Sequence, residues 1–454
     1  MLFEKIDTTG LAHYSYIIGD QNEAVVIDPR RDIDVYLNKA SKQGYQIKYI
    51  FETHRNEDYV IGSFDLAKLT GAQIWHADYN LNYQYGQAVR DQQKFSVGRL
   101  KIKAINTPGH TLNSFSYILY DFSEEPLMVF TGDALFAGDT GRVDLMGEDL
   151  MDELAHKLYD SIYNKILPLS DSVIMCPAHG SGSVCGHAIA ERELTTLGLE
   201  KKVNPNLQYE NEEEFVENVK EVLERPPYFR EMERLNLTGS SFIRGLPETE
   251  ALKPGHFDKK LQSGDTLVLD IRNELDFAAA HIPNSISIWQ EGLASFAGWF
   301  IPYDKDLLLM TAGNYPEEAI NILRRLGYDR IKGYLKGGML KWHMSGKKSN
   351  YIKTIRVQKL CTLIDQSRDY WLLDIRGEEE IAESGKIKNA HNIHITQLPD
   401  NLDKIPTEQP VYIFCGSGLR STTAASLLLR EGFENIHVIL GGLAGWSSTT
   451  CPIV

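Results

Sequence analysis

Short apolar runs, each followed by turn residues and a helical stretch, recur along most of the chain. In the first 190 residues, the runs AVVIDP (24–29) and YIFETH (49–54) have the composition of strands that end at a turn. Between residues 186 and 236 the pattern becomes polar and helical, and it is broken at Pro226 and Pro227. Farther on, apolar strands alternate again with helical stretches. This alternation predicts an α/β protein with mainly parallel sheets in its C-terminal part.

The C-terminal part of the chain repeats itself at a fixed spacing. Three pairs of landmarks lie 104 positions apart: Asp270 with Asp374, Thr311 with Cys415, and Trp342 with Trp446. A constant offset at three landmarks indicates a duplicated domain. We therefore expect three domains, which are residues 1–245 with the helical stretch included, residues 250–346 and residues 352–454.

Cys415 is the most reactive candidate in the second copy. It follows the apolar strand VYIF and precedes the helical stretch STTAASLLLREGF, and parallel sheets place functional groups at such strand ends. Gly416 and Gly418 allow a tight turn whose N–H groups point at one centre. The helix dipole and Arg420 add positive potential. These features favour a reactive thiolate or persulfide over a small buried core residue.

The loop CGSGLR resembles the six-residue active loop of sulfurtransferases, and both copies resemble rhodanese domains. The loop runs from Cys415 through Ser417 and Leu419 to Arg420. It is one residue shorter than a tyrosine-phosphatase loop, so it suits one sulfur atom better than a phosphate. The resemblance implies that Cys415 is the nucleophile and that Arg420 and the loop N–H groups hold the anion.

The first copy departs from this pattern. Its loop reads TAGNYP, with Thr311 in the place of the cysteine and Pro316 in the place of the arginine. Because a threonine hydroxyl cannot carry a persulfide, we expect this domain to be catalytically silent and to serve as a scaffold or interface.

Four motifs with metal-binding side chains occur in order in the first 180 residues. They are TH at a strand end, TPGHT, TGD and PAHG, and they contain His54, His110, Asp133 and His179. Each motif alone is more typical of a turn or a helix cap. Their order, together with LFAGDTGRVDL (135–145), resembles the metallo-β-lactamase fold in the branch of glyoxalase II and the persulfide dioxygenases. The resemblance implies an αββα sandwich, in which two mixed sheets pack face to face with helices outside.

The loop THRNEDYVIG (53–62) departs from the two-metal pattern H-x-H-x-D-H. Asp58 is retained, but Asn56 and Tyr59 occupy positions where the resemblance implies imidazole ligands. Asn56 either hydrogen-bonds a ligand or water or marks the loss of the metal. The second metal of the family would keep only Asp58, the bridging aspartate and His179, so this second site is badly weakened.

The site of the first metal retains more of the family's ligands. The resemblance leaves His54, His110 and Asp133 as its ligands, and two histidines with one carboxylate form the facial triad of mononuclear non-haem Fe(II) oxygenases. We therefore expect one Fe(II) per chain, with Zn as the alternative.

Sulfane sulfur is the chemistry that the two resemblances share. They imply a persulfide dioxygenase (sulfur dioxygenase) joined to a thiosulfate sulfurtransferase, with a low-molecular-weight thiol persulfide and O₂ as substrates and sulfite and thiosulfate as exchange partners. Arg142 either contacts an anionic group of the substrate or forms a structural ion pair with Asp144. Tyr59 and His179 would line the pocket. Cys185 is either a relay thiol or an inert buried residue.

Two other functions remain open. The chain could be a zinc thioester hydrolase similar to glyoxalase II, or a sulfurtransferase whose N-terminal domain is a metal-free scaffold. Metal content separates the three possibilities, because they require Fe, Zn or no metal.

Composition bears on the number of domains, the partners and the cellular location. The chain has 454 residues, too many for one core, and 43% of them are hydrophobic and 24% charged. A net charge of −15 argues against a nucleic-acid partner. Without an apolar run that could span a bilayer or a signal peptide, we expect a cytoplasmic protein with no membrane partner. The five cysteines do not suggest a disulfide framework and are expected to be thiols. The resemblance also implies a homo-oligomer.

Overall fold

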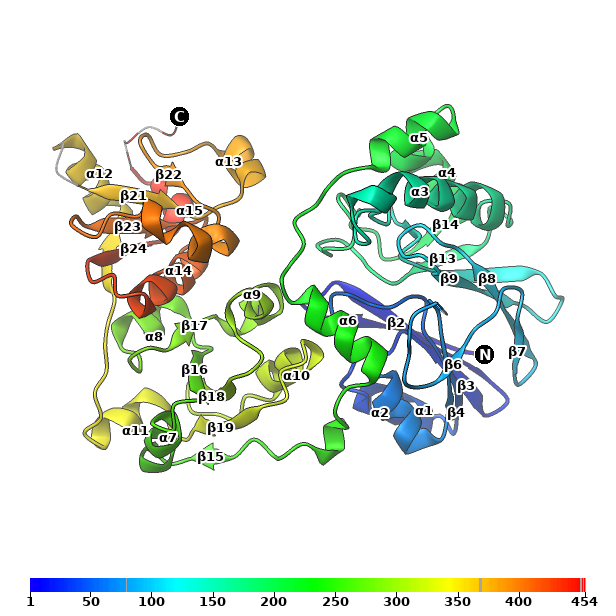
Figure 1. Cartoon of the computed structure of the whole chain (residues 1–454), viewed down its shortest axis with the longest axis horizontal. Coiled ribbons are helices and arrows are strands. Elements are labelled where there is room, and N and C mark those ends of the chain that lie inside the picture. The colour runs from blue at the N-terminus through cyan, green and yellow to red at the C-terminus, as the bar shows by residue number, and fades with distance from the viewer. Residues whose placement is uncertain (79, 367–369, 450, 452, 454) are drawn as a thin grey trace. The chain divides into compact units, whose positions relative to one another are not determined.

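The computed structural model describes residues 1–78, 80–366, 370–449, 451 and 453 (Figure 1). The chain forms two compact units. The first comprises Met1–Leu246 with Arg324–Asp329, and the second comprises Pro247–Leu323 with Arg330–Val454. Among the described residues, no helix combines the length and the apolar character that a membrane crossing requires.

Two six-stranded sheets form the framework of the first unit. The strands of one sheet follow in chain order, antiparallel from β1 to β3 and parallel from β3 to β6: β1 (Leu2–Thr8), β2 (His13–Asp20), β3 (Glu23–Ile27), β4 (Gln46–Phe51), β5 (Gln73–His76) and β6 (Gln87–Ala88). The other sheet has the order β14-β13-β10-β9-β8-β7 and is antiparallel except between β10 and β13: β7 (Lys94–Val97), β8 (Leu100–Asn106), β9 (Phe115–Tyr120), β10 (Pro126–Gly132), β13 (Ile174–Pro177) and β14 (Thr195–Thr196). A short ribbon adds β11 (Leu135–Phe136) and β12 (Asp139–Thr140).

Aromatic and aliphatic side chains from both sheets fill the space between them. Phe51 of the first sheet stacks on Tyr117 of the second, with 4.6 Å between ring centroids, and Phe95 packs against Phe51 at 4.7 Å. Burial of such a side chain contributes about 2–3 kcal/mol. The predicted face-to-face sandwich is confirmed.

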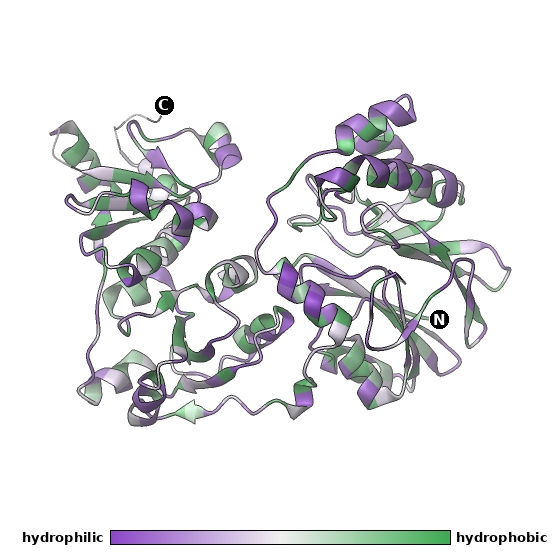
Figure 2. Cartoon of the chain, in the orientation of Figure 1, coloured by the Kyte–Doolittle hydropathy of each residue, from purple (hydrophilic) through white to green (hydrophobic). Residues whose placement is uncertain are grey.

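Helices cover the outer faces of this sandwich. In α3, the buried residues Met151, Leu154, Ala155 and Leu158 recur every three or four positions and so form one apolar face, and Figure 2 shows hydrophilic residues along the rest of the helix. The helices of the unit are α1 (Asp34–Lys42), α2 (Ser63–Thr70), α3 (Glu148–Tyr159), η1 (Asp160–Ile166), α4 (Leu197–Val203), η2 (Pro205–Leu207), α5 (Glu212–Val219), α6 (Phe229–Thr238) and η3 (Ile243–Gly245).

The second unit contains two five-stranded parallel sheets of identical topology. Their orders are β15-β19-β18-β16-β17 and β20-β24-β23-β21-β22. The strands are β15 (Ala251–Leu252), β16 (Thr266–Asp270), β17 (Ile286–Ser287), β18 (Asp306–Met310), β19 (Ile331–Leu335), β20 (Lys353–Arg356), β21 (Trp371–Asp374), β22 (His391–Asn392), β23 (Val411–Phe414) and β24 (Ile436–Leu440). The duplication read from the sequence therefore corresponds to two copies of one sheet.

Helices flank both of these sheets. They are α7 (Pro254–Leu261), α8 (Glu274–Ala279), η4 (Gln290–Gly292), α9 (Leu293–Phe300), α10 (Glu317–Arg325), α11 (Gly338–Met344), α12 (Val357–Asp365), α13 (Glu378–Ser384), η5 (Ile395–Lys404), α14 (Leu419–Arg430) and α15 (Gly442–Trp446). The helix α14 begins two residues earlier than the apolar pattern suggests, because Gly418 in the left-handed region ends the preceding loop.

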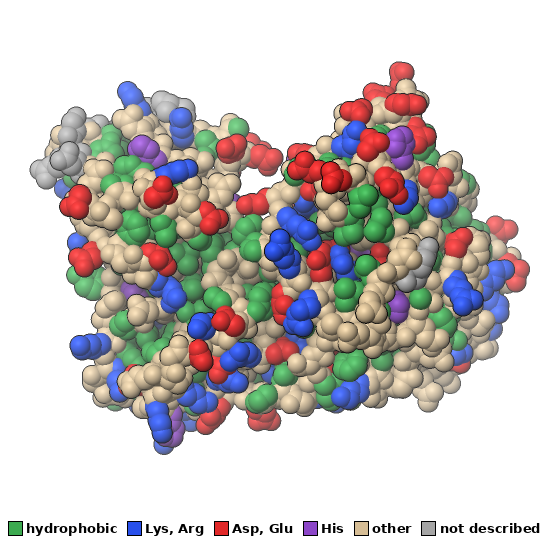
Figure 3. All heavy atoms as spheres, viewed as in Figure 1, with side chains coloured by type: hydrophobic (Ala, Val, Ile, Leu, Met, Phe, Trp, Pro, Cys, Tyr) green, Lys and Arg blue, Asp and Glu red, His purple; other side chains and the backbone are tan. Residues whose placement is uncertain are grey.

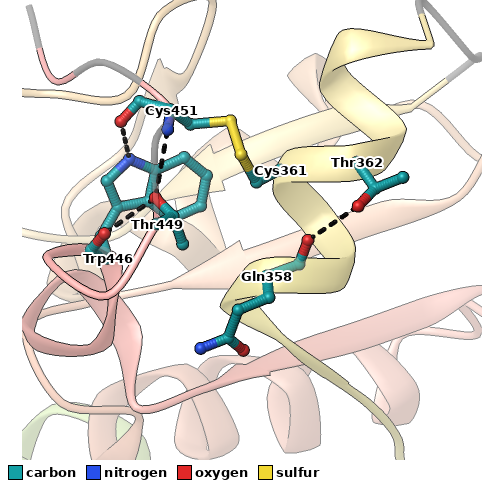
Figure 4. Close-up of a disulfide and its surroundings, with 6 residues drawn as sticks. All are labelled: Gln358, Cys361, Thr362, Trp446, Thr449 and Cys451. Carbon is teal, nitrogen blue, oxygen red and sulfur yellow. Dashed lines mark hydrogen bonds between the residues drawn. A yellow bond between two sulfur atoms is a disulfide. The ribbon is translucent and has the colours of Figure 1, made fainter.

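A disulfide bond joins Cys361 of α12 to Cys451, which follows α15 (Figure 4). The expectation that all cysteines are thiols is therefore wrong for this pair, and a separation of 90 residues hid their proximity in the sequence. The indole nitrogen of Trp446 also donates a hydrogen bond to the carbonyl of Cys451 at 3.1 Å. Cys176, Cys185 and Cys415 are free and buried.

Negative charge is concentrated on part of the surface of the first unit. Figure 3 shows acidic side chains gathered over α5 and its neighbour α3, and the first turn of α5 consists of Glu212, Glu213 and Glu214. Such a surface repels the phosphates of a nucleic acid.

Candidate functional site

Three strand ends of the first unit bring His54, His110 and Asp133 together. His54 follows β4, His110 lies between β8 and β9, and Asp133 follows β10. The Nε2 atoms of His54 and His110 lie 3.6 and 3.4 Å from Oδ2 of Asp133, and all three side chains are buried. Two ligand atoms about 2.1 Å from a shared ion lie roughly 3–3.4 Å apart. The spacing of these three predicted residues therefore suits a common metal.

Hydrogen bonds fix which nitrogen each imidazole presents. The hydroxyl of Thr53 donates to Asp28 at 2.8 Å and so accepts from Nδ1 of His54 at 2.9 Å. Nδ1 of His110 donates to the carbonyl of Arg142 at 2.9 Å. Both Nε2 atoms then carry lone pairs, and neither has a hydrogen-bond partner although both are buried. Unpaired buried nitrogens facing a carboxylate are the donor set that a metal ion requires.

Burial also keeps these imidazoles uncharged. It lowers the pKa of His54 to about 3, which the negative charge of Asp133 only partly opposes. It lowers the pKa of His110 in the same way. Neutral imidazoles are the form that binds metals.

His179 lies between two carboxylates. Its Nδ1 is 2.8 Å from Oδ1 of Asp133, and its Nε2 is 3.1 Å from Oδ2 of Asp58. Burial lowers the pKa of His179, but the charges of Asp133 and Asp58 outweigh burial and raise it well above its ordinary value. With both nitrogens engaged, His179 orients Asp133 rather than presenting a lone pair to a second metal.

The loop that carries Asn56 and Tyr59 is fastened by α6. The side-chain amide of Asn236 donates to the carbonyls of Asn56 and Tyr59 at 2.7 and 2.8 Å, and its oxygen accepts from the N–H of Ile61 at 2.9 Å. Oδ1 of Asn56 and the hydroxyl of Tyr59 are buried without partners. The helical extension thus holds the loop that carries His54, Asn56 and Tyr59 in place.

Arg142 is fully occupied by structural contacts. Its guanidinium binds both oxygens of Asp144 at 2.6 Å and donates to the carbonyls of Val184 at 3.1 Å and Leu223 at 2.9 Å. The ion pair with Asp144, one of the two roles suggested by the sequence, accounts for two of these four contacts, and backbone carbonyls accept the other two.

Sequence reasoning missed His13 and Glu57, and it left Cys185 as either a relay thiol or an inert buried residue. A carboxylate oxygen of Glu57 lies within 4.8 Å of a ring nitrogen of His54 and of His110. The sulfur of Cys185 lies within 4.8 Å of a ring nitrogen of His110 and a carboxylate oxygen of Asp133. Burial raises the pKa of Glu57 to about 8 and that of Cys185 well above its usual range. His13 packs its ring on Tyr59 at 4.1 Å. The resemblance supplied ligands only at other positions, so nothing in the sequence drew attention to Glu57.

The thiol of Cys415 lies in the loop between β23 and α14, as the sequence predicts. Its sulfur accepts the N–H of Gly418 at 3.1 Å. The loop carbonyls of Cys415 and Gly416 accept N–H groups of Leu443 and Ala444 in α15 at 2.8 and 2.9 Å. Ser417 is exposed, and Leu419 begins α14.

Arg420 has a partner that the sequence did not suggest. One nitrogen of its guanidinium lies 2.8 Å from each carboxylate oxygen of Glu380 in α13. The same carboxylate reaches the mouth of the loop, because a Cβ on Gly416 would lie 3.0 Å from Oε1 of Glu380. An anion that binds this nitrogen of Arg420 therefore competes with Glu380.

The matching loop of the first copy holds its threonine in local bonds. The hydroxyl of Thr311 donates to the carbonyl of Asn314 at 3.1 Å and accepts from the N–H of Gly313 at 2.9 Å. These bonds occupy the only polar atom of the side chain.

Comparison with known proteins matches both parts of the chain. The model of the metallo-beta-lactamase superfamily matches residues 8–179, and that of the rhodanese-like domain matches residues 253–345 and 357–449. The persulfide dioxygenase ETHE1 of Mus musculus is 30% identical over 216 residues, which are 44% of this chain and 73% of that protein. The hydroxyacylglutathione hydrolase GloC of Haemophilus influenzae is 27% identical over 214 residues, 42% of this chain and 91% of that protein.

One solved structure covers much of the chain. The crystal structure of a metallo-beta-lactamase from Staphylococcus aureus subsp. aureus COL has a TM-score of 0.65 and 29% identity, and the match covers 74% of this chain and 99% of that one. The likeness therefore extends beyond the first unit.

Proposed function

This chain belongs to the persulfide dioxygenase branch of the metallo-β-lactamase superfamily and carries two tandem rhodanese-like domains, and we propose that it oxidises a low-molecular-weight thiol persulfide with O₂ and transfers sulfane sulfur at Cys415. Its relatives and domains assign it to sulfur metabolism. The observation that supports the oxidation most directly is the pair of buried, unpartnered Nε2 atoms of His54 and His110 beside Asp133.

The proposed ligands are His54, His110 and Asp133. Fe(II) bound there would supply open coordination positions for the persulfide sulfur and O₂. The hydrogen bonds at Nδ1 hold both imidazoles in the required tautomer, and His179 fixes the orientation of Asp133. Complete burial of the three side chains limits the access of bulk water.

The overall oxidation balances as R–S–SH + O₂ + H₂O → R–SH + SO₃²⁻ + 2H⁺. The outer sulfur is oxidised and O₂ is reduced. At the second copy, the Cys415 thiolate attacks the outer sulfur of a donor, the S–S bond of the donor breaks, and its other half leaves with the electron pair. The resulting Cys415 persulfide passes its sulfur to sulfite to give thiosulfate, and the thiolate returns.

Aerobic turnover of a thiol persulfide by the iron-loaded chain tests the oxidation. We expect O₂ consumption with sulfite or thiosulfate formation, and loss of both in His110→Ala, which removes one proposed ligand. An iron-loaded, folded chain that consumes no O₂ would exclude the dioxygenase function.

A zinc thioester hydrolase is the second candidate, because the similarity to hydroxyacylglutathione hydrolase GloC covers most of that relative. The structure favours it less, since His179 is tied to Asp58 and Asp133 and no imidazole stands at positions 56 and 59. Metal analysis of the purified chain separates the two: about one Fe per chain supports oxidation, whereas one or two Zn with thioester cleavage supports hydrolysis.

A further inference from the structure

Glu57 places a third unpartnered ligand atom beside the two imidazoles. A carboxylate oxygen of Glu57 and one ring nitrogen each of His54 and His110 all lie within 4.8 Å of one another. Oε2 of Glu57, Nε2 of His54 and Nε2 of His110 are buried, and none has a hydrogen-bond partner. Each of these three neighbouring side chains therefore keeps one buried ligand atom unpaired, which is costly unless a cation binds there.

The two nearby carboxylates differ in how their oxygens are occupied. Both oxygens of Asp133 lie near Nδ1 of His179, at 2.8 and 3.0 Å. Only one oxygen of Glu57 has a donor, Nη2 of Arg55 at 3.1 Å. The two oxygens of Asp133 thus share one donor from the protein, whereas Oε2 of Glu57 has none.

A purely structural role as the counter-ion of Arg55 does not explain this arrangement. Arg55 already pairs with Glu233 of α6 at 3.0 Å, and its backbone N–H is held by Asp78 at 2.8 Å. An ion pair also does not require full burial of the second carboxylate oxygen, yet Glu57 is completely buried.

We propose that Glu57 is a metal ligand, so that this chain binds its ion through His54, Glu57 and His110 together with Asp133. The carboxylate compensates for the imidazole that the family pattern has at position 56, where this chain has Asn56. Two carboxylates balance the charge of a divalent ion and make the set harder, which favours Fe(II) over softer ions. The inference rests on the metal centre of the proposed function but not on its persulfide chemistry.

Metal titration of the full chain tests the assignment independently of turnover. The chain is freed of metal with a chelator and titrated with Fe(II) under anaerobic conditions and with Co(II) as an optical probe. We expect Glu57→Gln to lower the affinity for both ions by about 10-fold or more and to shift the visible Co(II) bands. Glu233→Gln, which removes the other partner of Arg55, and Glu52→Gln, a buried carboxylate that hydrogen-bonds Tyr85, should change the affinity less than about 3-fold.

The controls make each outcome decisive. If Glu57→Gln binds both ions as tightly as the unmodified chain, with an unchanged Co(II) spectrum and thermal unfolding, Glu57 is not a ligand. If Glu57→Gln does not fold, Glu57→Asp replaces it: this variant keeps the charge beside Arg55 but withdraws the oxygen by one methylene, and an unchanged spectrum would equally refute the assignment. A chain that shows the Glu57 effect but consumes no O₂ would refute the proposed oxidation alone.

Discussion

The two rhodanese-like copies share a buried ion pair and differ in the loop that follows β18 in the first copy and β23 in the second. In the first copy Arg272 lies 2.6 and 2.8 Å from the oxygens of Asp270, and in the second Arg376 lies 2.7 and 3.0 Å from those of Asp374. Both arginines also donate to a backbone carbonyl at 2.8 Å. The D-I-R motif therefore serves the fold in both copies and cannot by itself indicate activity.

The loops after β18 and β23 differ in their polar groups. The loop of the first copy uses its Thr311 hydroxyl for bonds within the loop, whereas the loop of the second copy directs the N–H of Gly418 at the sulfur of Cys415. Only the second loop has a guanidinium, that of Arg420. The same backbone plan thus carries a thiol and a guanidinium in one copy and neither group in the other.

The largest expected effect is the loss of the only loop thiol. Cys415→Ser should lower sulfur transfer from thiosulfate at least about 10³-fold, because a hydroxyl does not form a persulfide. O₂ uptake with a thiol persulfide should persist, since the metal centre is unchanged. Adding Thr311→Cys to this variant should not restore transfer, because Pro316 supplies no cation. If Thr311→Cys did restore sulfur transfer, the first copy would lack only the thiol, and the missing arginine would not prevent its activity.

The second copy has a disulfide bond that the first copy lacks, and its removal should have the next largest effect. The positions that match Cys361 and Cys451 are Phe257 and Lys347, and Lys347 forms an ion pair with Asp258 instead. Replacing both cysteines by serine should lower the free energy of unfolding of the second copy by about 2–5 kcal/mol, because the bond closes a 90-residue loop. Hydrogen exchange of the β23 amides would measure this loss.

The matched control is Lys347→Ala in the first copy. A partly exposed ion pair contributes only about 0–1 kcal/mol, so the β18 amides should keep nearly all of their protection. A reductant should reproduce the serine effect in the unmodified chain. Equal protection of β23 with and without the bond would mean that α12 and the C-terminal segment are held by packing alone.

Replacing the glycine that packs against each loop should have a smaller effect on stability, and the effect should differ between the two copies. Gly442 has φ +51°, and an added Cβ would lie 2.3 Å from the carbonyl oxygen of Cys415; the matching Gly338 has φ +60° and 3.1 Å to the carbonyl oxygen of Thr311. Gly442→Ala should therefore cost about 1–3 kcal/mol and slow sulfur transfer, and Gly338→Ala should cost less. Denaturant unfolding with a transfer assay measures both, and an equal cost in the two copies would contradict the closer approach in the second.

The sequence predicted the elements better than the contacts between side chains. The strands before Cys415, His54 and Asp133 were predictable because apolar runs ended by turn residues have a local cause. Glu380 beside Arg420, Asn236 behind the loop of Asn56, and Glu57 beside the histidines could not be predicted. These contacts join residues that are distant in sequence or that no family pattern marks, and they depend on tertiary packing that local periodicity does not determine.

Removing the contact between Glu380 and Arg420 should have the smallest effect, a change in KM for the sulfur donor. An anionic donor competes with Glu380 for one nitrogen of the guanidinium. The side chains of Glu380 and Arg420 are partly exposed, at 36% and 23%, so the pair is worth only about 0–1 kcal/mol. Glu380→Gln should therefore lower KM for thiosulfate about 3-fold with little change in kcat, and more so at low ionic strength, where the charge is less screened. Glu379→Gln, on the same turn of α13, controls for a general change in surface charge. A rise in KM for Glu380→Gln alone would instead mean that Glu380 orients Arg420 toward the donor, and the carboxylate would then be a positioning residue rather than a competitor.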